Sequence, residues 1–351
     1  MENVAIRELE TSDYEALAIF NSAFPDDKRS KEEWLERFMY WWDQNPAYDE
    51  NWVRGFLLLD NEKIVGFVGS FPTLFKAGND IIKAFNGTTW RVLENYRRWS
   101  IDLWTKNREV SKDYLSFNTT PTKEVISLIK RYKYFLYPWG NEKASYVITQ
   151  AKDFSKIFLP PSLNKINGIT GIGINMLQIL KQRLSKSSLI VKEIDPLKVD
   201  LNNLWENTKG TVEFTNVRDS CTVRWYAQNR KMLGVFDKEE LIAYALFDLK
   251  KHSKYNFQIM IMVDLWYQKI TGLKEILSVL IRYCNKYASK NMITYIEYPH
   301  FSKDLSYTCQ SLGLNKKSNI STGYIRFANN QKYEMNNDNS YFTLVQGDYG
   351  V

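Results

Sequence analysis

Hydrophobic and polar positions alternate along the first 150 residues in a way that predicts a mixed order of strands and helices. Residues 4–10 alternate as a strand does, and two Ser-x-x-Glu patterns, beginning at Ser12 and Ser30, are typical of helix starts. Two β-rich runs joined by the polar turn Asp60-Asn61-Glu62 predict a hairpin. After it, the pattern predicts strands at 81–92, 114–118, 134–137 and 145–149, and helices at 101–110 and 122–131.

A similar order of elements returns after residue 188. It begins with a strand at 189–194 and includes a second hairpin around Asp237-Lys238-Glu239. A strongly amphipathic helix is predicted at 273–286, because its apolar residues repeat at helical spacing. The other predictions are helices at 201–207, 212–228 and 303–311, and strands at 257–265, 292–298, 324–327 and 342–345.

Short stretches of residues repeat as well as the pattern. Trp41-Trp42-Asp43-Gln44-Asn45 is matched by Trp225-Tyr226-Ala227-Gln228-Asn229, and the turn Asp60-Asn61-Glu62 by Asp237-Lys238-Glu239. Both matches have an offset of about 180 residues, which indicates a duplicated domain. We therefore predict a first domain at 1–150, a connector at 151–188 with Pro160-Pro161 in it, and a second domain at 189–351.

Composition narrows the class of protein. The 351 residues are 44% hydrophobic and 15% aromatic, which suffices for packed cores, and the formal charge of +7 favours anionic partners. Three cysteines without metal-ligand or disulfide spacing, and only two histidines, argue against a zinc site and a Ser-His-Asp hydrolase. No signal peptide and no apolar run long enough for a membrane span is visible, so we expect a soluble, cytoplasmic protein without a metal.

The order of strand, two helices, hairpin, strand, helix, strand, helix and closing strands resembles the GNAT acyltransferase superfamily. In that superfamily the fourth strand enters a helix through an Arg/Gln-x-x-Gly-x-Gly/Ala loop, whose backbone N–H groups face the pyrophosphate of coenzyme A. Residues 90–101 resemble this run, and Leu312-Gly313-Leu314 resembles the superfamily's later Leu-Gly-Phe. The resemblance implies an α+β fold of two tandem GNAT-like domains, each with a mixed, mostly antiparallel sheet flanked by helices.

The whole chain resembles a tandem-GNAT group of polysaccharide and amino-sugar pathways, and it shares the two-domain layout of FemABX transferases. This resemblance implies a cytoplasmic N-acyltransferase whose donor is acetyl-CoA or another acyl-CoA and whose acceptor is an amino sugar or sugar nucleotide. It implies no DNA partner. The first domain would hold the donor, and the second, with a poorer loop at 268–273, would form the other wall of the acceptor cleft.

The resemblance also implies donor-binding residues. Arg97 and Arg98 would clamp the pyrophosphate. The alternative is that these two arginines belong to a solvated basic turn. Ser100 and Asp102 replace the two loop glycines, which hinders a close approach of phosphate. The full set comprises the fourth strand, the loop and the end of the fifth strand: Thr88, Thr89, Trp90, Arg91, Val92, Arg97, Arg98, Trp99, Ser100, Ile101, Asn118, Thr119 and Thr120.

A catalytic base is harder to assign. The superfamily often places it on the fourth strand, where this chain has Asn86, which is not a base. Amine acylation needs a proton acceptor, and three carboxylates are candidates: Asp348, Asp264 and Glu94. Asp264 could instead cap a strand end, and Asp348 could belong to an ordinary chain terminus.

Two other functions stay open. A FemABX-like transferase would use aminoacyl-tRNA, although the chain has no concentrated basic stripe and no long coiled-coil insertion. A catalytically inactive binding module would explain why Ser100, Asp102 and Asn86 depart from the superfamily pattern.

Overall fold

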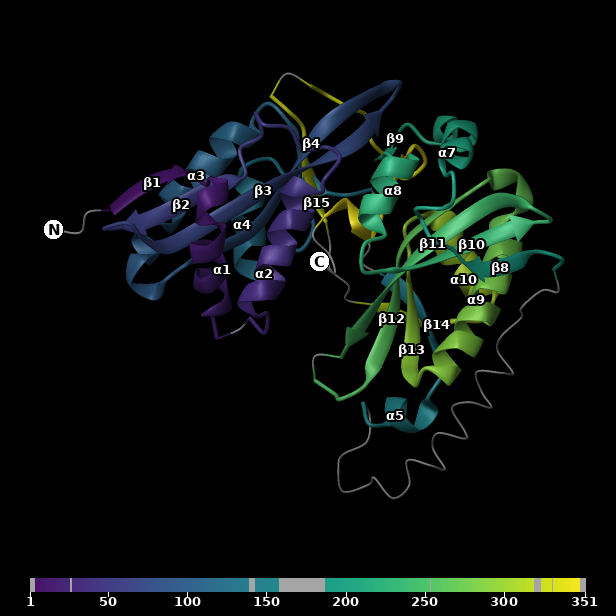
Figure 1. Cartoon of the computed structure of the whole chain (residues 1–351). Coiled ribbons are helices and arrows are strands. Elements are labelled where there is room, and N and C mark those ends of the chain that lie inside the picture. Colours follow the sequence, from purple (N-terminus) through teal and green to yellow (C-terminus); the bar gives the residue numbers. More distant parts are fainter. Residues whose placement is uncertain are drawn as a thin grey trace.

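A computed structural model of the chain describes residues 4–25, 27–138, 143–157, 187–252, 254–318, 323–329 and 331–347. The described residues form two mixed sheets flanked by helices (Figure 1). The first sheet has the order β1-β2-β3-β4-β5-β15-β6, with β9 beside the end of β3 and β16 beside β9. The second has the order β14-β7-β13-β12-β11-β10-β8.

The first part of the chain follows the predicted order closely. In the labels, η marks a short 3₁₀ or π-helical segment. Its elements are β1 (Val4–Glu8), η1 (Thr11–Asp13), α1 (Tyr14–Ser22), α2 (Lys31–Phe38), η2 (Met39–Asp43), β2 (Gly55–Asp60), β3 (Lys63–Ala77), β4 (Asp80–Val92), η3 (Glu94–Trp99), α3 (Ser100–Ser111), β5 (Leu115–Asn118), α4 (Lys123–Arg131), β6 (Phe135–Leu136), β7 (Lys143–Ile148) and α5 (Ala151–Ser155).

The second part repeats the order with several differences from the prediction, among them the strand β14, which was not predicted. The region 212–228 holds a short strand and a short helix, and residues 344–346 form a 3₁₀ turn where a strand was predicted. The elements are β8 (Ile190–Glu193), α7 (Asn202–Thr208), η5 (Lys209–Thr211), β9 (Phe214–Asn216), α8 (Ser220–Tyr226), β10 (Lys231–Asp237), β11 (Glu240–Lys251), β12 (Gln258–Tyr267), η6 (Lys269–Thr271), α9 (Leu273–Lys290), β13 (Ile293–Pro299), α10 (Lys303–Ser311), β14 (Asn315–Ser318), β15 (Tyr324–Arg326), β16 (Ser340–Tyr341) and η7 (Leu344–Gln346).

Helix starts show which local signals the chain uses. The capping box at Ser30 is confirmed: Ser30 Oγ accepts from the Glu33 N–H at 3.2 Å, and the Glu33 carboxylate accepts from the Ser30 N–H at 2.7 Å. The box predicted at Ser12 is wrong by two residues. Asp13 accepts from the Glu10 N–H instead, because Arg7 holds that carboxylate with two bonds of 2.7 Å.

Helices cover both faces of the first sheet. Buried Leu57, Phe67 and Phe71 face α1 and α2, as part of the largest hydrophobic core. The alternate residues Leu58 and Val68 lie on the other face with Leu103 of α3. This alternation explains why successive residues are apolar at 56–58 of β2 and at 64–68 of β3: both faces of these strands are buried.

The sheets exchange strands across the boundary that we predicted at residue 150. β7 lies between β13 and β14 in the second sheet, and β15, from near the C-terminus, lies between β5 and β6 in the first. The predicted connector at 151–188 begins with α5, which lies against β13, and its residues 158–186 are outside the described ones. Each half therefore completes the other half's sheet.

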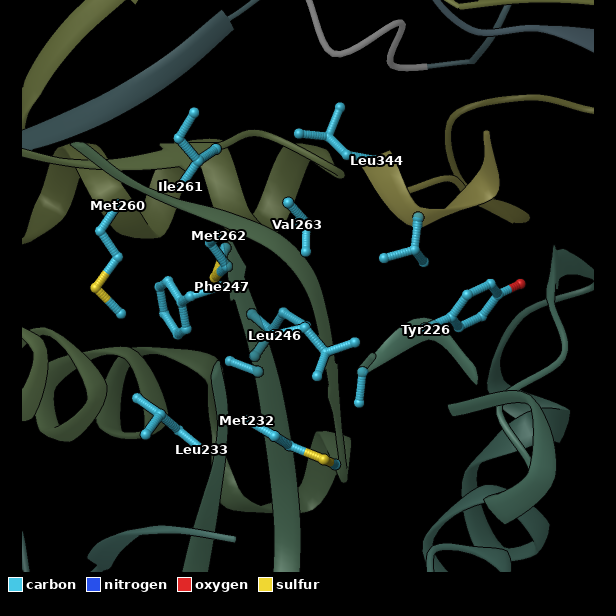
Figure 2. Close-up of a cluster of buried hydrophobic side chains, with 14 of the residues drawn as sticks. Tyr226, Met232, Leu233, Leu246, Phe247, Met260, Ile261, Met262, Val263 and Leu344 are labelled. Atoms are coloured by element: carbon cyan, nitrogen blue, oxygen red, sulfur yellow. The ribbon is translucent and has the colours of Figure 1, made fainter. Parts of the chain in front are cut away.

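The core of the second half lies on β10, β11 and β12. Figure 2 shows Met232, Leu233, Leu246, Phe247 and Met262 in this core, all of them buried. Helix α9 contacts β13 and β8 through its apolar stripe, so the predicted amphipathic helix is confirmed. Leu344, close to the C-terminus, belongs to the same core.

Candidate active site

The fourth and fifth strands of the first half separate. β4 and β5 pair in parallel at Ala84–Leu115, Phe85–Ser116 and Asn86–Phe117 only. β4 then continues along β3 to Val92, whereas β5 ends at Asn118. No strand in the described part of the chain pairs with residues 87–92 on the side away from β3. We call this stretch the open edge of β4, since an edge without a neighbouring strand can pair with a ligand.

A β-bulge lies in this open stretch. Val68 of β3 pairs with Trp90 and Gly69 pairs with Thr88, so Thr89 has no partner on β3. Thr89 has φ of 37°, in the left-handed region that a β-branched residue rarely adopts. Bulges turn backbone groups out of the ladder and recur next to active sites. The bulge places Thr88 and Thr89 at the point where β4 and β5 diverge.

A large cavity lies beside the end of β4. Its volume is about 1280 Å³, and α1, the start of β3, the end of β4, η3 and the start of α3 contribute its lining. The lining includes six of the predicted donor-binding residues and one of the predicted bases: Trp90, Arg91, Val92, Arg97, Ser100, Ile101 and Glu94. The other residues that line the cavity are mostly apolar. The structure does not place Thr88, Thr89, Arg98 or Trp99 in its lining.

The predicted pyrophosphate loop is a 3₁₀ helix. Residues 94–99 form η3, which continues into α3, and the N–H of Ser100 donates to the Arg97 carbonyl. Without glycine the segment adopts the right-handed turn that ordinary residues favour. The Ser100 N–H is thus occupied. The Arg97 side chain lies at the rim of the cavity, where it is 73% exposed and 4.0 Å from the Glu94 carboxylate.

Arg91 has a structural role. Its guanidinium donates to the Asn21 carbonyl at 3.1 Å and to the Asp27 carboxylate at 2.6 Å, which fastens β4 to α1. Burial opposes ionisation of Asp27, but hydrogen bonds from the Arg29 backbone and from Arg91 outweigh it and lower the pKa of the carboxyl. Arg91 therefore forms a wall of the cavity and is not a free cation within it.

The end of β5 meets the C-terminal segment. Asn118 is the last residue of β5, and Thr119 and Thr120 follow it. Gly347 lies directly against the Thr119 side chain, so closely that a Cβ at this position would overlap it. The C-terminal segment thus reaches the point where β4 and β5 separate. Asp348, one of the predicted bases, comes next in the chain and lies outside the described residues.

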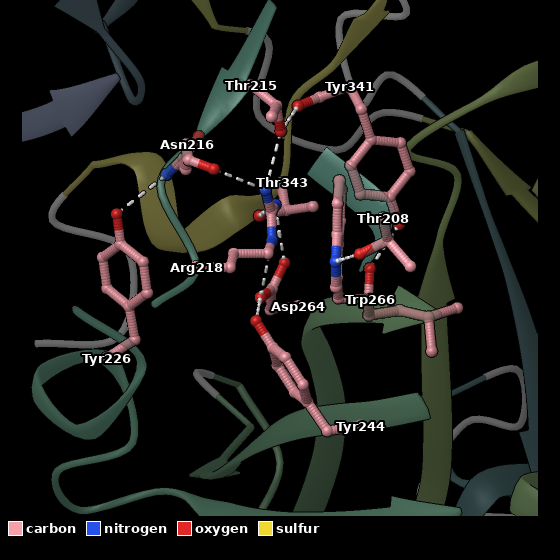
Figure 3. A network of polar contacts seen from close by, with 11 residues as sticks. Thr208, Thr215, Asn216, Arg218, Tyr226, Tyr244, Asp264, Trp266, Tyr341 and Thr343 are labelled. Carbon is pink, nitrogen blue, oxygen red and sulfur yellow. Dashed lines mark hydrogen bonds and ion pairs between the residues drawn. The ribbon is translucent and has the colours of Figure 1, made fainter. Parts of the chain in front are cut away.

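Asp264 is a buried structural residue and not the predicted base. It is fully buried, and its carboxylate accepts from Arg218 at 3.0 and 3.2 Å and from the Tyr244 hydroxyl at 2.7 Å (Figure 3). Arg218 also donates to Thr215 and to the Asn216 carbonyl. An acceptor amine has no access to a carboxylate that is enclosed in this way.

Arg218 also closes the second half's counterpart of the open edge. β12 pairs with β13 only as far as Ile261–Glu297 and then continues to Tyr267, as β4 does in the first half. Beyond this pairing, the Arg218 guanidinium lies 4.5 Å from the Trp266 ring, and the Tyr341 hydroxyl donates to the Leu265 carbonyl at 2.7 Å. Side chains of the chain itself occupy this region. Sequence reasoning missed Arg218, because an isolated arginine outside any motif gives no signal.

Among the described residues, no helix combines the length and the apolar character that a bilayer crossing requires.

Comparisons with known proteins identify the fold. No family model and no curated protein matches the sequence. Among solved structures, a GCN5-related N-acetyltransferase from Anabaena variabilis matches with a TM-score of 0.55 and 10% identity, over 93% of this chain and 73% of that one. N-myristoyltransferase of Saccharomyces cerevisiae with bound myristoyl-CoA matches with a TM-score of 0.57 and 10% identity, over 98% and 90%. A second structure of that enzyme with bound myristoyl-CoA has 12% identity over 97% and 83%, also with a TM-score of 0.57.

These likenesses span nearly the whole chain, which confirms the predicted α+β class with mixed sheets flanked by helices. The chain therefore has the fold that GCN5-related N-acetyltransferase and N-myristoyltransferase share.

Proposed function

We propose that this protein is an acyl-CoA-dependent N-acyltransferase whose donor site is in the first half. The observation that carries the proposal is the open edge of β4 at residues 87–92, next to a cavity of about 1280 Å³. An extended pantetheine arm has amide groups that can pair with such an edge as a strand would. The fold shared with acyl-CoA-dependent enzymes supports this use of the site.

The reaction is a direct transfer. The acceptor amine attacks the thioester carbonyl, a C–N bond forms, the C–S bond breaks, and coenzyme A leaves as the thiol after taking up a proton. Negative charge develops on the carbonyl oxygen in the transition state, and a backbone N–H at the bulge around Thr89 is well placed to stabilise it. We propose acetyl-CoA as the donor, and an amino sugar, free or nucleotide-linked, as the acceptor.

The amine must lose a proton, and two of the three predicted bases remain candidates. Glu94 lines the cavity, with its side chain 85% exposed. Asp348 follows Gly347, which contacts Thr119 at the separation of β4 and β5. We expect Asp348→Asn to lower turnover with little effect on donor affinity, and Glu94→Gln to lower it less. Parallel measurement of kcat and of donor affinity for both variants distinguishes the two residues.

Calorimetry with acetyl-CoA tests the donor site. We expect the wild type to bind and Arg97→Ala to bind about tenfold more weakly, since a charge-assisted phosphate contact is lost. Arg131→Ala is the matched control, because Arg131 is also exposed and does not line the cavity. Absence of binding by the wild type would contradict the proposal. Binding without turnover over an amine panel would instead favour an inactive binding module, which the occupied Ser100 N–H makes the second candidate.

A further inference from the structure

Arg218, which is fully buried, has an acceptor for each of its five N–H donors (Figure 3). Nε and Nη2 donate to Asp264, and Nη1 donates to the Thr215 hydroxyl at 2.6 Å and to the Asn216 carbonyl at 2.9 Å. The remaining donor, on Nη2, reaches the Thr343 hydroxyl at 3.3 Å. Because every donor has an acceptor, the guanidinium has one fixed orientation in the fold.

Two of these contacts hold the C-terminal segment, residues 340–347. Thr343 belongs to this segment and accepts directly from Arg218. Thr215 carries the second contact, because its hydroxyl accepts from Arg218 and donates to the Tyr341 carbonyl at 2.8 Å. The guanidinium carbon also lies 5.4 Å from the centre of the Tyr341 ring. Arg218 therefore fixes the segment at Tyr341 and at Thr343.

The residue between these two contacts packs against the first half. Phe342 stacks on Tyr137 with ring centroids 4.8 Å apart, and it lies 6.1 Å from the ring of Phe117 on β5. Successive side chains of an extended chain point to opposite sides, which explains why its two neighbours face Arg218 instead. The segment is thus held by both halves just before it reaches Thr119.

We propose that Arg218 is a positioning residue for acyl transfer: by holding Thr343, it sets how closely the C-terminal segment approaches Thr119, where β4 and β5 separate. Gly347 of the same segment lies directly against the Thr119 side chain. The inference rests on the proposed function, which puts the reacting thioester at this separation and the phosphates of the donor at the rim near Arg97. A displaced segment should therefore slow the transfer step and leave donor binding unchanged.

Thr343→Val tests the proposal, because it removes the hydroxyl that accepts from Arg218 and keeps the shape of the side chain. With glucosamine as the acceptor, we expect kcat to fall about tenfold, while calorimetry gives the same affinity for acetyl-CoA as the wild type. Thr343→Ser keeps the hydroxyl and should restore most of kcat. Ser145→Ala is the matched control: it removes a buried hydroxyl that bonds to His300 at 3.0 Å, and it should leave kcat unchanged although it lowers stability.

Arg218→Lys tests the residue itself. A lysine keeps the positive charge beside Asp264, but its three donors cannot serve all four groups that Arg218 contacts. We expect this variant to lower kcat at least as much as Thr343→Val does, again with the donor affinity of the wild type. A role in stability alone predicts a lower melting temperature with an unchanged kcat.

Hydrogen exchange followed by mass spectrometry gives a readout that needs no turnover. Thr343→Val should speed exchange about tenfold at the amides of residues 341–347 and leave β12 unchanged, whereas Ser145→Ala should leave both unchanged. Equal exchange in wild type and Thr343→Val, or faster exchange with an unchanged kcat, would overturn the proposal. A wild type that binds no acetyl-CoA would instead overturn the proposed function, and the exchange data would still decide whether Arg218 holds the segment.

Discussion

Trp225 and Tyr40 join the two halves of the chain. Their rings stack with centroids 4.8 Å apart and planes inclined by 21°, and the indole N–H of Trp225 donates to the Tyr40 carbonyl at 2.8 Å. Trp225 belongs to the repeated segment that matches Trp41, and Tyr40 precedes Trp41. The repeated aromatic segments therefore face each other across the interface and are buried, as core residues are.

Because of this contact, we expect the stability of the fold to depend on Trp225. We expect Trp225→Ala to lower the free energy of unfolding by about 3 to 5 kcal/mol, because a fully buried indole is lost at an interface that cannot collapse easily. Trp225→Phe keeps the ring and should cost less. Denaturant unfolding followed by circular dichroism measures both; an alanine variant as stable as the wild type would show that the interface contributes little.

Substitutions in the buried Arg218–Asp264 pair should lower stability more when one partner is removed than when both are replaced. Asp264→Ala should cost about 3 to 5 kcal/mol, because the Arg218 charge stays buried without a partner. The double variant Arg218→Met, Asp264→Leu should recover much of that loss. If Asp264→Asn folds normally yet abolishes turnover while Tyr244→Phe does not, Asp264 has the catalytic role that its burial argues against.

The lowered pKa of Asp27 should make the stability of the fold depend on pH. Its pKa is lower in the folded chain than in the unfolded one, so its contribution is present above the unfolded value and is lost as the pH falls through the folded value. We expect the difference in melting temperature between wild type and Asp27→Asn to be constant from neutral pH down to about pH 4 and to shrink below it. A difference that grows in acid would reverse the sign and contradict the assignment.

The close contact between Gly347 and Thr119 limits the size of the residue at position 347. Its φ of −120° suits any residue, so the close contact with Thr119, and not the backbone conformation, excludes a side chain. We expect Gly347→Ala to displace the C-terminal segment and reduce turnover, and Thr119→Ala to restore part of the loss in the double variant. The coupling energy from this double-mutant cycle is the measurement, and additive effects would mean that the contact is unimportant.

The closed region around Arg218 predicts one donor site per chain. Side chains occupy the second half's counterpart of the open edge, whereas the first half's edge lies next to a cavity. Calorimetric titration with acetyl-CoA should therefore show a single equivalent bound. Two equivalents of similar affinity would mean that Arg218 and Tyr341 move aside.

Local signals in the sequence were sufficient for much of this fold. Strand-forming runs of residues predicted β4 and, together with the polar turn at 60–62, the hairpin of β2 and β3. The helical spacing of α9 was unambiguous, since these patterns depend on residues close in the chain. Trp90, Arg91, Val92, Arg97, Ser100 and Ile101 were predicted as one group and line one cavity, because they are consecutive or nearly so. The resemblance of residues 90–101 to a glycine-rich loop was misleading about conformation, because without glycine the segment forms a 3₁₀ helix.

The sequence by itself determined most of the order of elements and the α+β class, because periodicity and turn residues are local properties of the chain. Tertiary structure decided the exchange of β7 and β15 between the sheets, the burial of Asp264 by Arg218 and the approach of Gly347 to Thr119. Each of these joins residues that are far apart in sequence. Such contacts depend on shape and on the pairing of buried charge, and periodicity has no information about either.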